Sequence, residues 1–148
     1  MTTAAADYQK FLPEGIPPAQ MPFWESLKAR AVQVQRCDNC HAYLYIPKDI
    51  CNHCHSDRLT WTPISGHGEI YTYTVVRRAP TPAYAEDAPY TLVHVTMDEG
   101  FRMIGKLNGV APEDVRIGAP VQITYEEVTP EWTLMEFEPA PATAGAER

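Results

Sequence analysis

The chain of 148 residues contains none of the short motifs that mark common catalytic sites. It has no Gly-x-Ser-x-Gly turn, no Walker loop and no Gly-x-Gly-x-x-Gly sequence. Gly66-His67-Gly68 precedes a predicted strand, so no helix N-terminus is expected there to bind a phosphate. No nucleophile pairs with a base. His67 lies in a predicted turn and His94 in a predicted strand, where we interpret them as solvated and structural residues. The sequence therefore predicts no catalytic residue.

Long apolar runs are also missing. A membrane-spanning helix needs about 20 consecutive apolar residues, and no stretch of this chain approaches that length. Residues 1–10 have no apolar segment of the kind found in a secretory signal. We therefore expect a cytoplasmic protein that does not contact a membrane.

Basic residues are scarce relative to acidic ones. The chain has 12 Lys and Arg against 19 Asp and Glu, which gives a net charge of −7, and the acidic excess arises in residues 61–148. Affinity for nucleic acid depends on a basic surface that contacts phosphates. The composition therefore argues against a nucleic-acid partner.

Cysteine is limited to four residues, which form two Cys-x-x-Cys pairs: Cys37 with Cys40, and Cys51 with Cys54. Two residues between thiols let one tight turn direct both sulfurs to one ion, and two such turns complete a tetrahedral site. A disulfide would require an oxidising compartment. A thioredoxin-type dithiol would require a βαβ context that neither pair has. The pattern predicts a metal ion held by all four cysteines.

Soft thiolates in a tetrahedral arrangement select zinc, with a single iron as the alternative. Because four thiolates leave no open coordination position, the ion is predicted to be structural rather than catalytic. His41, His53 and His55 lie in or beside the same two turns. One of them could replace a cysteine as ligand. Since four thiolates already fill the tetrahedron, we expect these histidines to be exposed at the tips of the turns.

The residues around the cysteines predict a short helix and a zinc ribbon. After an extended arm over residues 1–20, the segment 21–30 has Pro22 in its first turn and apolar residues at helical spacing. Residues 32–35, 44–47 and 59–64 are expected to form strands that flank the two cysteine turns. A module of about 30 residues is too small to fold by apolar burial alone, so the ion is predicted to supply much of its stability.

From Gly66 onwards the sequence alternates with the period of β-strands. Strands are predicted at 70–76, 90–97, 101–107, 121–125 and 132–137, with a proline-rich loop and a helical turn between them. Five such strands favour a small closed barrel, of which the OB fold is the best-known case. The predicted fold class is therefore mainly β: a short N-terminal helix, a zinc ribbon and a five-stranded OB-fold barrel.

These patterns divide the chain into four segments. Residues 1–34 are predicted to form the arm and helix, 35–64 the zinc ribbon, 65–139 the OB-fold barrel and 140–148 a polar tail. The boundaries follow the start of the cysteine turns, the change to a period of two, and the prolines that close the last strand.

Two groups of side chains are candidates for contacts with other molecules. Phe23, Trp24 and Leu27 lie on the predicted helix, which follows a proline-containing arm. They can pack on their own domain or dock on a partner. Aromatic side chains are favoured anchors in interfaces, so we predict that these three residues form a partner interface. Arg77 and Arg78 adjoin the proline-rich loop and are candidates for contact with an anionic ligand, with solubility as their alternative role.

The order of these parts resembles DUF35, a family that joins a rubredoxin-like zinc ribbon to an OB fold. The resemblance covers about residues 21–139. One departure is Asn52-His53, where many members have proline after the third cysteine. The matching segments are Phe23-Trp24-Glu25 with Leu27, Gln35-Arg36-Cys37-Asp38-Asn39-Cys40, Cys51-Asn52-His53-Cys54, Gly66-His67-Gly68-Glu69-Ile70-Tyr71-Thr72-Tyr73-Thr74-Val75-Val76, Ala88-Pro89-Tyr90, Asp98-Glu99-Gly100, Val115-Arg116-Ile117-Gly118 and Phe137-Glu138-Pro139.

The resemblance implies an accessory subunit of acyl-CoA chemistry that is not catalytic alone. Members accompany thiolase-superfamily enzymes, acetyltransferases or MaoC-type enoyl-CoA hydratases. In steroid side-chain degradation they pair with a thiolase-like, lipid-transfer-protein type enzyme that acts as a retro-aldolase. The resemblance thus implies a hetero-oligomer in which this chain stabilises its partner and helps to hold an acyl-CoA, as a subunit of a lyase or an acyltransferase.

Two other classes of function remain as alternatives at the level of sequence. A ribbon joined to an OB fold is compatible with a nucleic-acid-binding module, which the acidic balance disfavours. A rubredoxin-like electron carrier would hold iron in place of zinc. The colour of the purified protein separates the second alternative from a zinc protein.

Overall fold

The computed structural model describes residues 8–141. The first seven residues of the predicted arm, and residues 142–148 of the predicted tail, lie outside the described residues. The chain forms two compact units. The first consists of residues up to Ser65 with Glu99–Phe101 and Tyr125–Leu134, and the second consists of Gly66–Asp98, Arg102–Thr124 and the residues from Met135 onwards. Each unit therefore contains segments that are distant in sequence.

The first unit begins with a short 3₁₀ turn, η1 (Pro18–Gln20), and helix α1 (Met21–Lys28). Pro22 occupies the first turn of α1, where its missing N–H leaves no bond unmade. Phe23, Ser26 and Leu27 are buried on one side of the helix. The Ser26 hydroxyl donates to the carbonyl of Phe23 (2.6 Å) and accepts from the N–H of Gln33 (3.0 Å), which fixes the end of the helix to the chain that follows.

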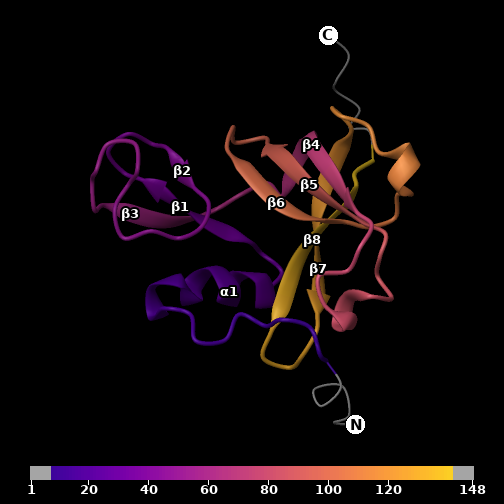
Figure 1. The fold of residues 1–148 in the computed structure, drawn as a ribbon. Helices are drawn as coiled ribbons and strands as arrows, with labels where there is room; N and C mark the ends of the chain where they lie inside the picture. The colour runs from indigo at the N-terminus through magenta and orange to yellow at the C-terminus, as the bar shows by residue number, and fades with distance from the viewer. Residues whose placement is uncertain (1–7, 142–148) are drawn as a thin grey trace. The chain divides into compact units, whose positions relative to one another are not determined.

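The cysteine-bearing part of this unit is a three-stranded antiparallel sheet of order β2–β1–β3, which is drawn in indigo to purple in Figure 1. Its strands are β1 (Gln33–Cys37), β2 (Tyr43–Leu44) and β3 (Leu59–Pro63). β1 is the central strand, and its five residues pair with β3 from Gln33↔Pro63 to Cys37↔Leu59. The first cysteine turn links β1 to β2, and the second lies between β2 and β3. This is the zinc-ribbon arrangement that the sequence predicts.

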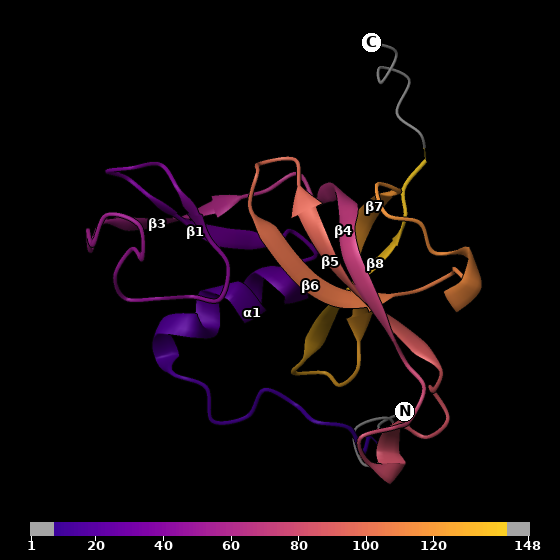
Figure 2. The same cartoon turned by 45° about the horizontal axis from the view of Figure 1, so that its top comes forward.

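The remaining five strands close into a barrel of order β4–β5–β6–β8–β7. Their bounds are β4 (His67–Val76), β5 (Tyr90–Met97), β6 (Arg102–Leu107), β7 (Pro120–Glu127) and β8 (Thr133–Pro139). β4, β5 and β6 form an antiparallel meander, whose strands lie side by side in Figures 1 and 2. The barrel is closed by antiparallel pairing of β4 with β7 and by a parallel bridge from β6 to β8. The predicted fold class is confirmed.

The interior of the barrel is filled by side chains from alternate strand positions. Phe137 is fully buried, and an added Cβ at Gly105 would lie 2.9 Å from its ring. Gly68 is constrained further, since a Cβ there would lie 2.4 Å from the carbonyl oxygen of Thr96. Real Cβ atoms do not approach backbone oxygen so closely, so β4 and β5 require glycine at this crossing. The other fully buried side chains of the barrel are Val93, Val95, Met97, Met103 and Val121.

Short 3₁₀ turns interrupt the connections of the barrel. They are η2 (Pro82–Tyr84), within the predicted proline-rich loop, and η3 (Pro112–Asp114), within the predicted helical turn. β4 begins at His67, three residues earlier than the sequence suggests, because its first residues pair with β7 across the closure. Over residues 8–141, no helix has the length and apolar character required to cross a bilayer.

Candidate metal centre

The four cysteines come together at one end of the three-stranded sheet. Their sulfur atoms all lie within 4.8 Å of one another. The Sγ atoms of Cys37 and Cys54 are 3.5 Å apart, and those of Cys40 and Cys51 are 3.7 Å apart. Each short distance joins one Cys-x-x-Cys pair to the other, so the two turns face each other as the spacing predicts.

The two turns have the same backbone geometry. The N–H of His41 donates to the carbonyl of Cys37 and the N–H of His55 donates to that of Cys51, both at 2.9 Å. Both histidines have a positive φ, of 64° and 62° respectively. A left-handed residue after the second cysteine reverses the chain and leaves both thiols on the inner side of the turn. Two matched turns therefore build one site from local geometry alone.

The sulfur separations fit a tetrahedral ion and do not fit a disulfide. A disulfide requires an S–S distance of about 2.05 Å, and the cysteines of this structure are free. Four sulfurs at about 2.3 Å from a tetrahedral zinc lie about 3.8 Å from one another. The measured 3.5 and 3.7 Å are close to that edge length. The four thiols therefore suit a metal ion, and they would coordinate it without an open position for a substrate.

The thiols are not equivalent electrostatically. A hydrogen bond from the Asn39 side chain, followed by the N–H of Ser56, lowers the pKa of Cys54 to about 6. The Ala42 N–H acts to lower the pKa of Cys40, but desolvation and the three neighbouring sulfurs outweigh it and raise that pKa to about 12. Four crowded thiols cannot all ionise without a cation between them, because each thiolate disfavours the next. A bound cation would relieve this conflict.

A small buried cluster surrounds the cysteine turns. It consists of Cys37, Cys51 and Leu44, with Cys54 and Leu59 packed against them. Three of these five side chains are thiols of the candidate site. Removal of the ion would leave them without the contacts that hold the two turns together, so the metal and the local fold are coupled.

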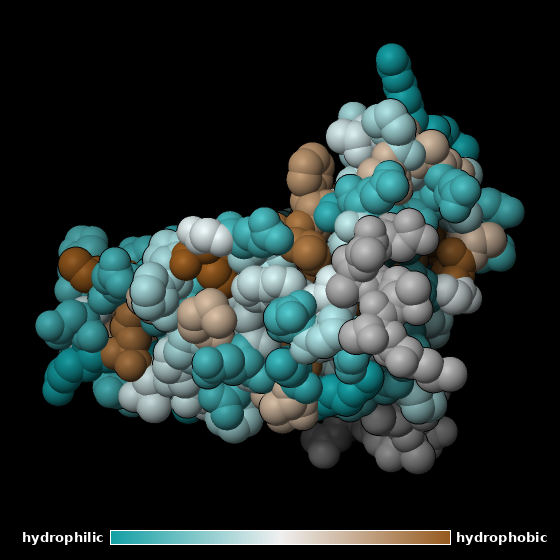
Figure 3. All heavy atoms as spheres, turned by 90° about the horizontal axis from the view of Figure 1, so that it is seen from below, coloured by the Kyte–Doolittle hydropathy of each residue, from teal (hydrophilic) through white to brown (hydrophobic). Residues whose placement is uncertain are grey.

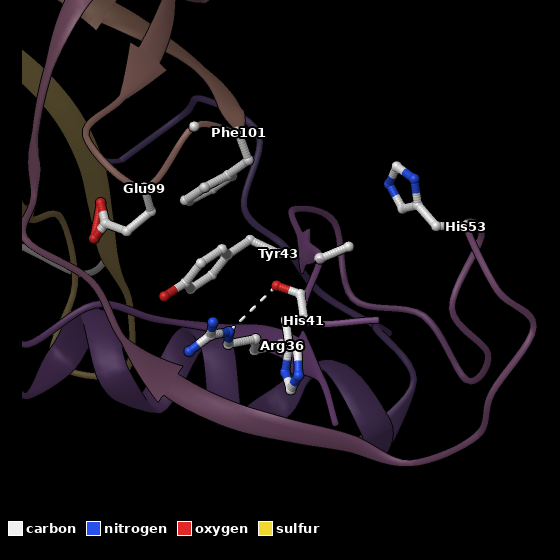
Figure 4. Close-up of a pocket in the computed structure, with 8 residues that line it drawn as sticks. Arg36, His41, Tyr43, His53, Glu99 and Phe101 are labelled. Carbon is white, nitrogen blue, oxygen red and sulfur yellow. Dashed lines mark hydrogen bonds between the residues drawn. The ribbon is translucent and has the colours of Figure 1, made fainter. Parts of the chain in front are cut away.

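A hollow of about 420 Å³ lies beside the cysteine turns, within the first unit. Figure 4 shows the rings of Tyr43 and Phe101 lying face to face, at 5.4 Å and 17°, with the Arg36 guanidinium 5.0 Å from the Tyr43 ring centroid. The Arg36 Nε donates to the carbonyl of His41 (3.2 Å). The Glu99 carboxylate accepts from the N–H of Ser65 (2.7 Å). Arg36, Tyr43, Glu99 and Phe101 thus all make contacts within the first unit.

The helix residues that the sequence assigned to a partner interface divide into two kinds. Phe23 and Leu27 are buried, with 7% and 1% of their surface exposed, and so they belong to the core of the first unit. Trp24 is partly exposed and packs edge-on against Phe23 (5.3 Å) and Trp132 (5.7 Å). The apolar spacing of a helix does not reveal how a distant segment such as Tyr125–Leu134 will cover it, and sequence reasoning missed Trp132 for this reason.

The other candidates lie on the barrel. Arg77 and Arg78 are exposed and directly follow β4. His67 and His94 are exposed strand residues on β4 and β5. Sequence reasoning also missed Asn39, whose side chain contacts the Cys54 thiol. Its place between the first two cysteines was the available signal, since an amide there can donate to a thiolate.

Comparison with known proteins identifies the relatives of this arrangement. Residues 61–126 match the family described as "ChsH2, C-terminal OB-fold domain". The chain is 32% identical over 107 residues to a "DUF35 domain-containing scaffold protein" of Methanocaldococcus jannaschii, covering 71% of this chain and 75% of the relative. It is 37% identical over 119 residues to a "Probable enoyl-CoA hydratase alpha subunit" of Thermomonospora curvata.

The match to the hydratase subunit covers 80% of this chain but only 37% of that relative, so the chain spans little more than a third of its length. A solved structure entitled "Ltp2-ChsH2(DUF35) aldolase" contains a chain of similar fold. The TM-score is 0.77 and the identity 34%, and the match covers 86% of this chain and 98% of that one. The similarity to this structure therefore extends over both the ribbon and the barrel.

Proposed function

This chain belongs to the DUF35 family, and from that premise we propose that it is a non-catalytic accessory subunit of an acyl-CoA enzyme. The observation that carries the proposal is the match over 98% of a chain that stands in the structure of an aldolase. The partner subunit would be a thiolase-like enzyme of the lipid-transfer-protein type, acting as a retro-aldolase in steroid side-chain degradation. This chain would stabilise that enzyme in a cytoplasmic hetero-oligomer and help to shape its acyl-CoA site.

A second candidate is a subunit of a MaoC-type enoyl-CoA hydratase. The similarity to a probable enoyl-CoA hydratase alpha subunit favours it specifically. An acetyltransferase complex is a third arrangement of the same class. A nucleic-acid-binding module is the alternative from another class, and the net charge of −7 argues against it.

The ion is proposed to be zinc, with iron as the alternative. The tetrahedral thiolate set suits both metals, and the absence of an open position gives either one a structural role. For truncation experiments, 35–64 and 65–139 are the proposed bounds of the ribbon and the barrel.

Arg77 and Arg78 are proposed to contact the acyl-CoA held jointly with the partner. Both are exposed at the end of β4, and guanidinium groups pair well with phosphates. An acidic chain is a poor site for an anionic ligand on its own, so CoA affinity should appear mainly in the complex. Replacing both arginines by glutamine should weaken CoA binding by the complex without dissociating it.

Copurification tests the proposal. A tagged copy of the chain, expressed in its native host, should bring down a stoichiometric thiolase-like enzyme, and the complex should cleave or thiolyse an acyl-CoA. A hydratase fold in place of the thiolase would favour the second candidate. Retention on single-stranded nucleic acid that falls with salt, with no enzyme present, would overturn the proposal in favour of the nucleic-acid module.

A further inference from the structure

The loop between β2 and the second cysteine turn, residues 45–50, contains a residue in an unfavourable conformation. Ile46 has a φ of 66°. A left-handed conformation costs an ordinary residue free energy that glycine does not pay, and for a β-branched residue it is a genuine outlier. Glycine or asparagine would adopt this backbone without strain. The backbone conformation therefore does not explain why isoleucine occupies this position.

Packing within the chain does not explain the isoleucine either. The Ile46 side chain is 60% exposed, although it is a large apolar group. Ile50, in the same loop, is 52% exposed. An exposed apolar side chain contributes little to folding, because most of its surface remains in water. The loop thus combines backbone strain with apolar groups that the folded chain leaves uncovered.

Contacts on both sides of Ile46 hold it in this conformation. The buried side chain of Gln35 donates to the carbonyl of Lys48 (2.9 Å) and accepts from its N–H (2.7 Å), so that it pairs with the loop as a neighbouring strand would. The ring of Tyr45 packs 6.1 Å from that of Phe23. Cys51, which ends the loop, is fully buried in the metal centre. Strain persists where the surroundings determine the conformation from several sides, and such positions cluster at functional sites.

We infer that Ile46, supported by Ile50, is a preorganised anchor that inserts into an apolar pocket of the partner enzyme subunit. This inference rests on the proposed function and names one point of contact within it. A rigid loop loses little entropy on binding, so its apolar side chains become effective anchors. The chain itself carries −7, but this loop has one Lys48 and one Asp49 and is locally neutral. The matching face of the partner is therefore apolar rather than basic.

On the face of the molecule shown in Figure 3, apolar residues form small separate groups among hydrophilic ones. An enzyme subunit is the occupant that the relatives indicate, since one stands in the structure of an aldolase and another is described as a scaffold. A second copy of this chain is the competing occupant, and the experiment separates the two.

The test substitutes Ile46→Asn and measures two quantities with opposite expectations. Asparagine tolerates the left-handed backbone, so the thermal midpoint of the isolated metal-loaded chain should rise by about 2 °C. Affinity for the purified partner, taken from the copurified complex and titrated by calorimetry, should fall at least about fivefold. Ile46→Val keeps an apolar β-branched group and should retain most of the affinity. Ile117→Asn removes another exposed isoleucine, from a backbone without a positive φ, and serves as the matched control.

Four results would overturn the inference. If Ile46→Asn binds the partner with less than a fivefold loss, the loop is no anchor, and the proposed function stands. If the midpoint falls together with the affinity, Ile46 is a structural residue. If the isolated chain dimerises in sedimentation and Ile46→Asn abolishes the dimer, a second copy is the occupant. Copurification that yields no enzyme overturns the proposed function and this inference together, and is thereby distinguished from the other outcomes.

Discussion

At the scale of single residues, one buried group is unsatisfied. Thr91, on β5, is 2% exposed, and its hydroxyl is the only buried side-chain polar atom without a hydrogen-bond partner among residues 8–141. An unpaired buried hydroxyl keeps its desolvation cost and gains no bond in return. Valine has nearly the same shape and no polar atom, so it suits this position better.

We predict that Thr91→Val stabilises the protein by about 1 kcal/mol. The change in urea midpoint measures the gain. Thr129→Val is the matched control. Thr129 is also buried, with 6% of its surface exposed, but its hydroxyl accepts a hydrogen bond from the N–H of Trp132 (3.0 Å). That variant should lose about 1 kcal/mol. Equal losses for both variants would show that the Thr91 hydroxyl has a partner.

At the scale of elements, three of the five side chains in the buried cluster of the ribbon are thiols of the candidate metal centre. Cys40→Ser should abolish stoichiometric metal binding and cost several kcal/mol of ribbon stability, because metal-binding free energy is folding free energy in such modules. Elemental analysis and amide hydrogen exchange over the three strands measure the two effects. His53→Ala is the control, since His53 contacts the site through its backbone N–H, 3.4 Å from the Cys51 sulfur. If His53→Ala loses the metal while Cys40→Ser retains it, His53 rather than Cys40 is the fourth ligand.

Helix α1 carries the next prediction. Trp24 lies between Phe23 and Trp132 and remains partly exposed. Trp24→Ala should weaken assembly with the partner enzyme by about 2 kcal/mol if the residue is an interface hot spot, with metal content unchanged. Trp132→Ala is the control, because it removes the same ring contact between Trp24 and Trp132 but leaves Trp24 in place. It therefore separates an effect of lost internal packing from an effect of a lost interface residue. Assembly of Trp24→Ala at wild-type affinity would assign this tryptophan to the internal core.

At the scale of the whole molecule, catalysis should require the partner. The isolated chain should show no turnover of any acyl-CoA, because its cysteines all belong to the candidate metal centre and its sequence has no motif that pairs a nucleophile with a base. Steady-state assays with and without the partner measure this. Turnover by the single chain that is lost on replacing His67 or His94 would show that these exposed histidines are catalytic.

What the sequence by itself determined is local. Matched Cys-x-x-Cys turns, proline in the first turn of α1, and strands with a period of two depend on neighbours within a few residues, so their order was predicted correctly and most of their positions closely. The second strand of the ribbon was expected over residues 44–47, but β2 is Tyr43–Leu44. The family could be identified for the same reason, since its motifs are short and lie in order along the chain. The early start of β4 was missed because it depends on pairing with β7, about fifty residues away.

What only the tertiary structure decided is the environment of each side chain. Helical spacing showed that Phe23, Trp24 and Leu27 are apolar, but it could not show which of them the segment Tyr125–Leu134 and the ribbon would cover. In the sequence Ile46 is an ordinary apolar residue before a proline. Its positive φ is seen only in the structure, where Gln35 bonds Lys48 on one side of it and Phe23 lies against Tyr45 on the other. Burial and strain follow from long-range contacts, which residue spacing along the chain does not encode.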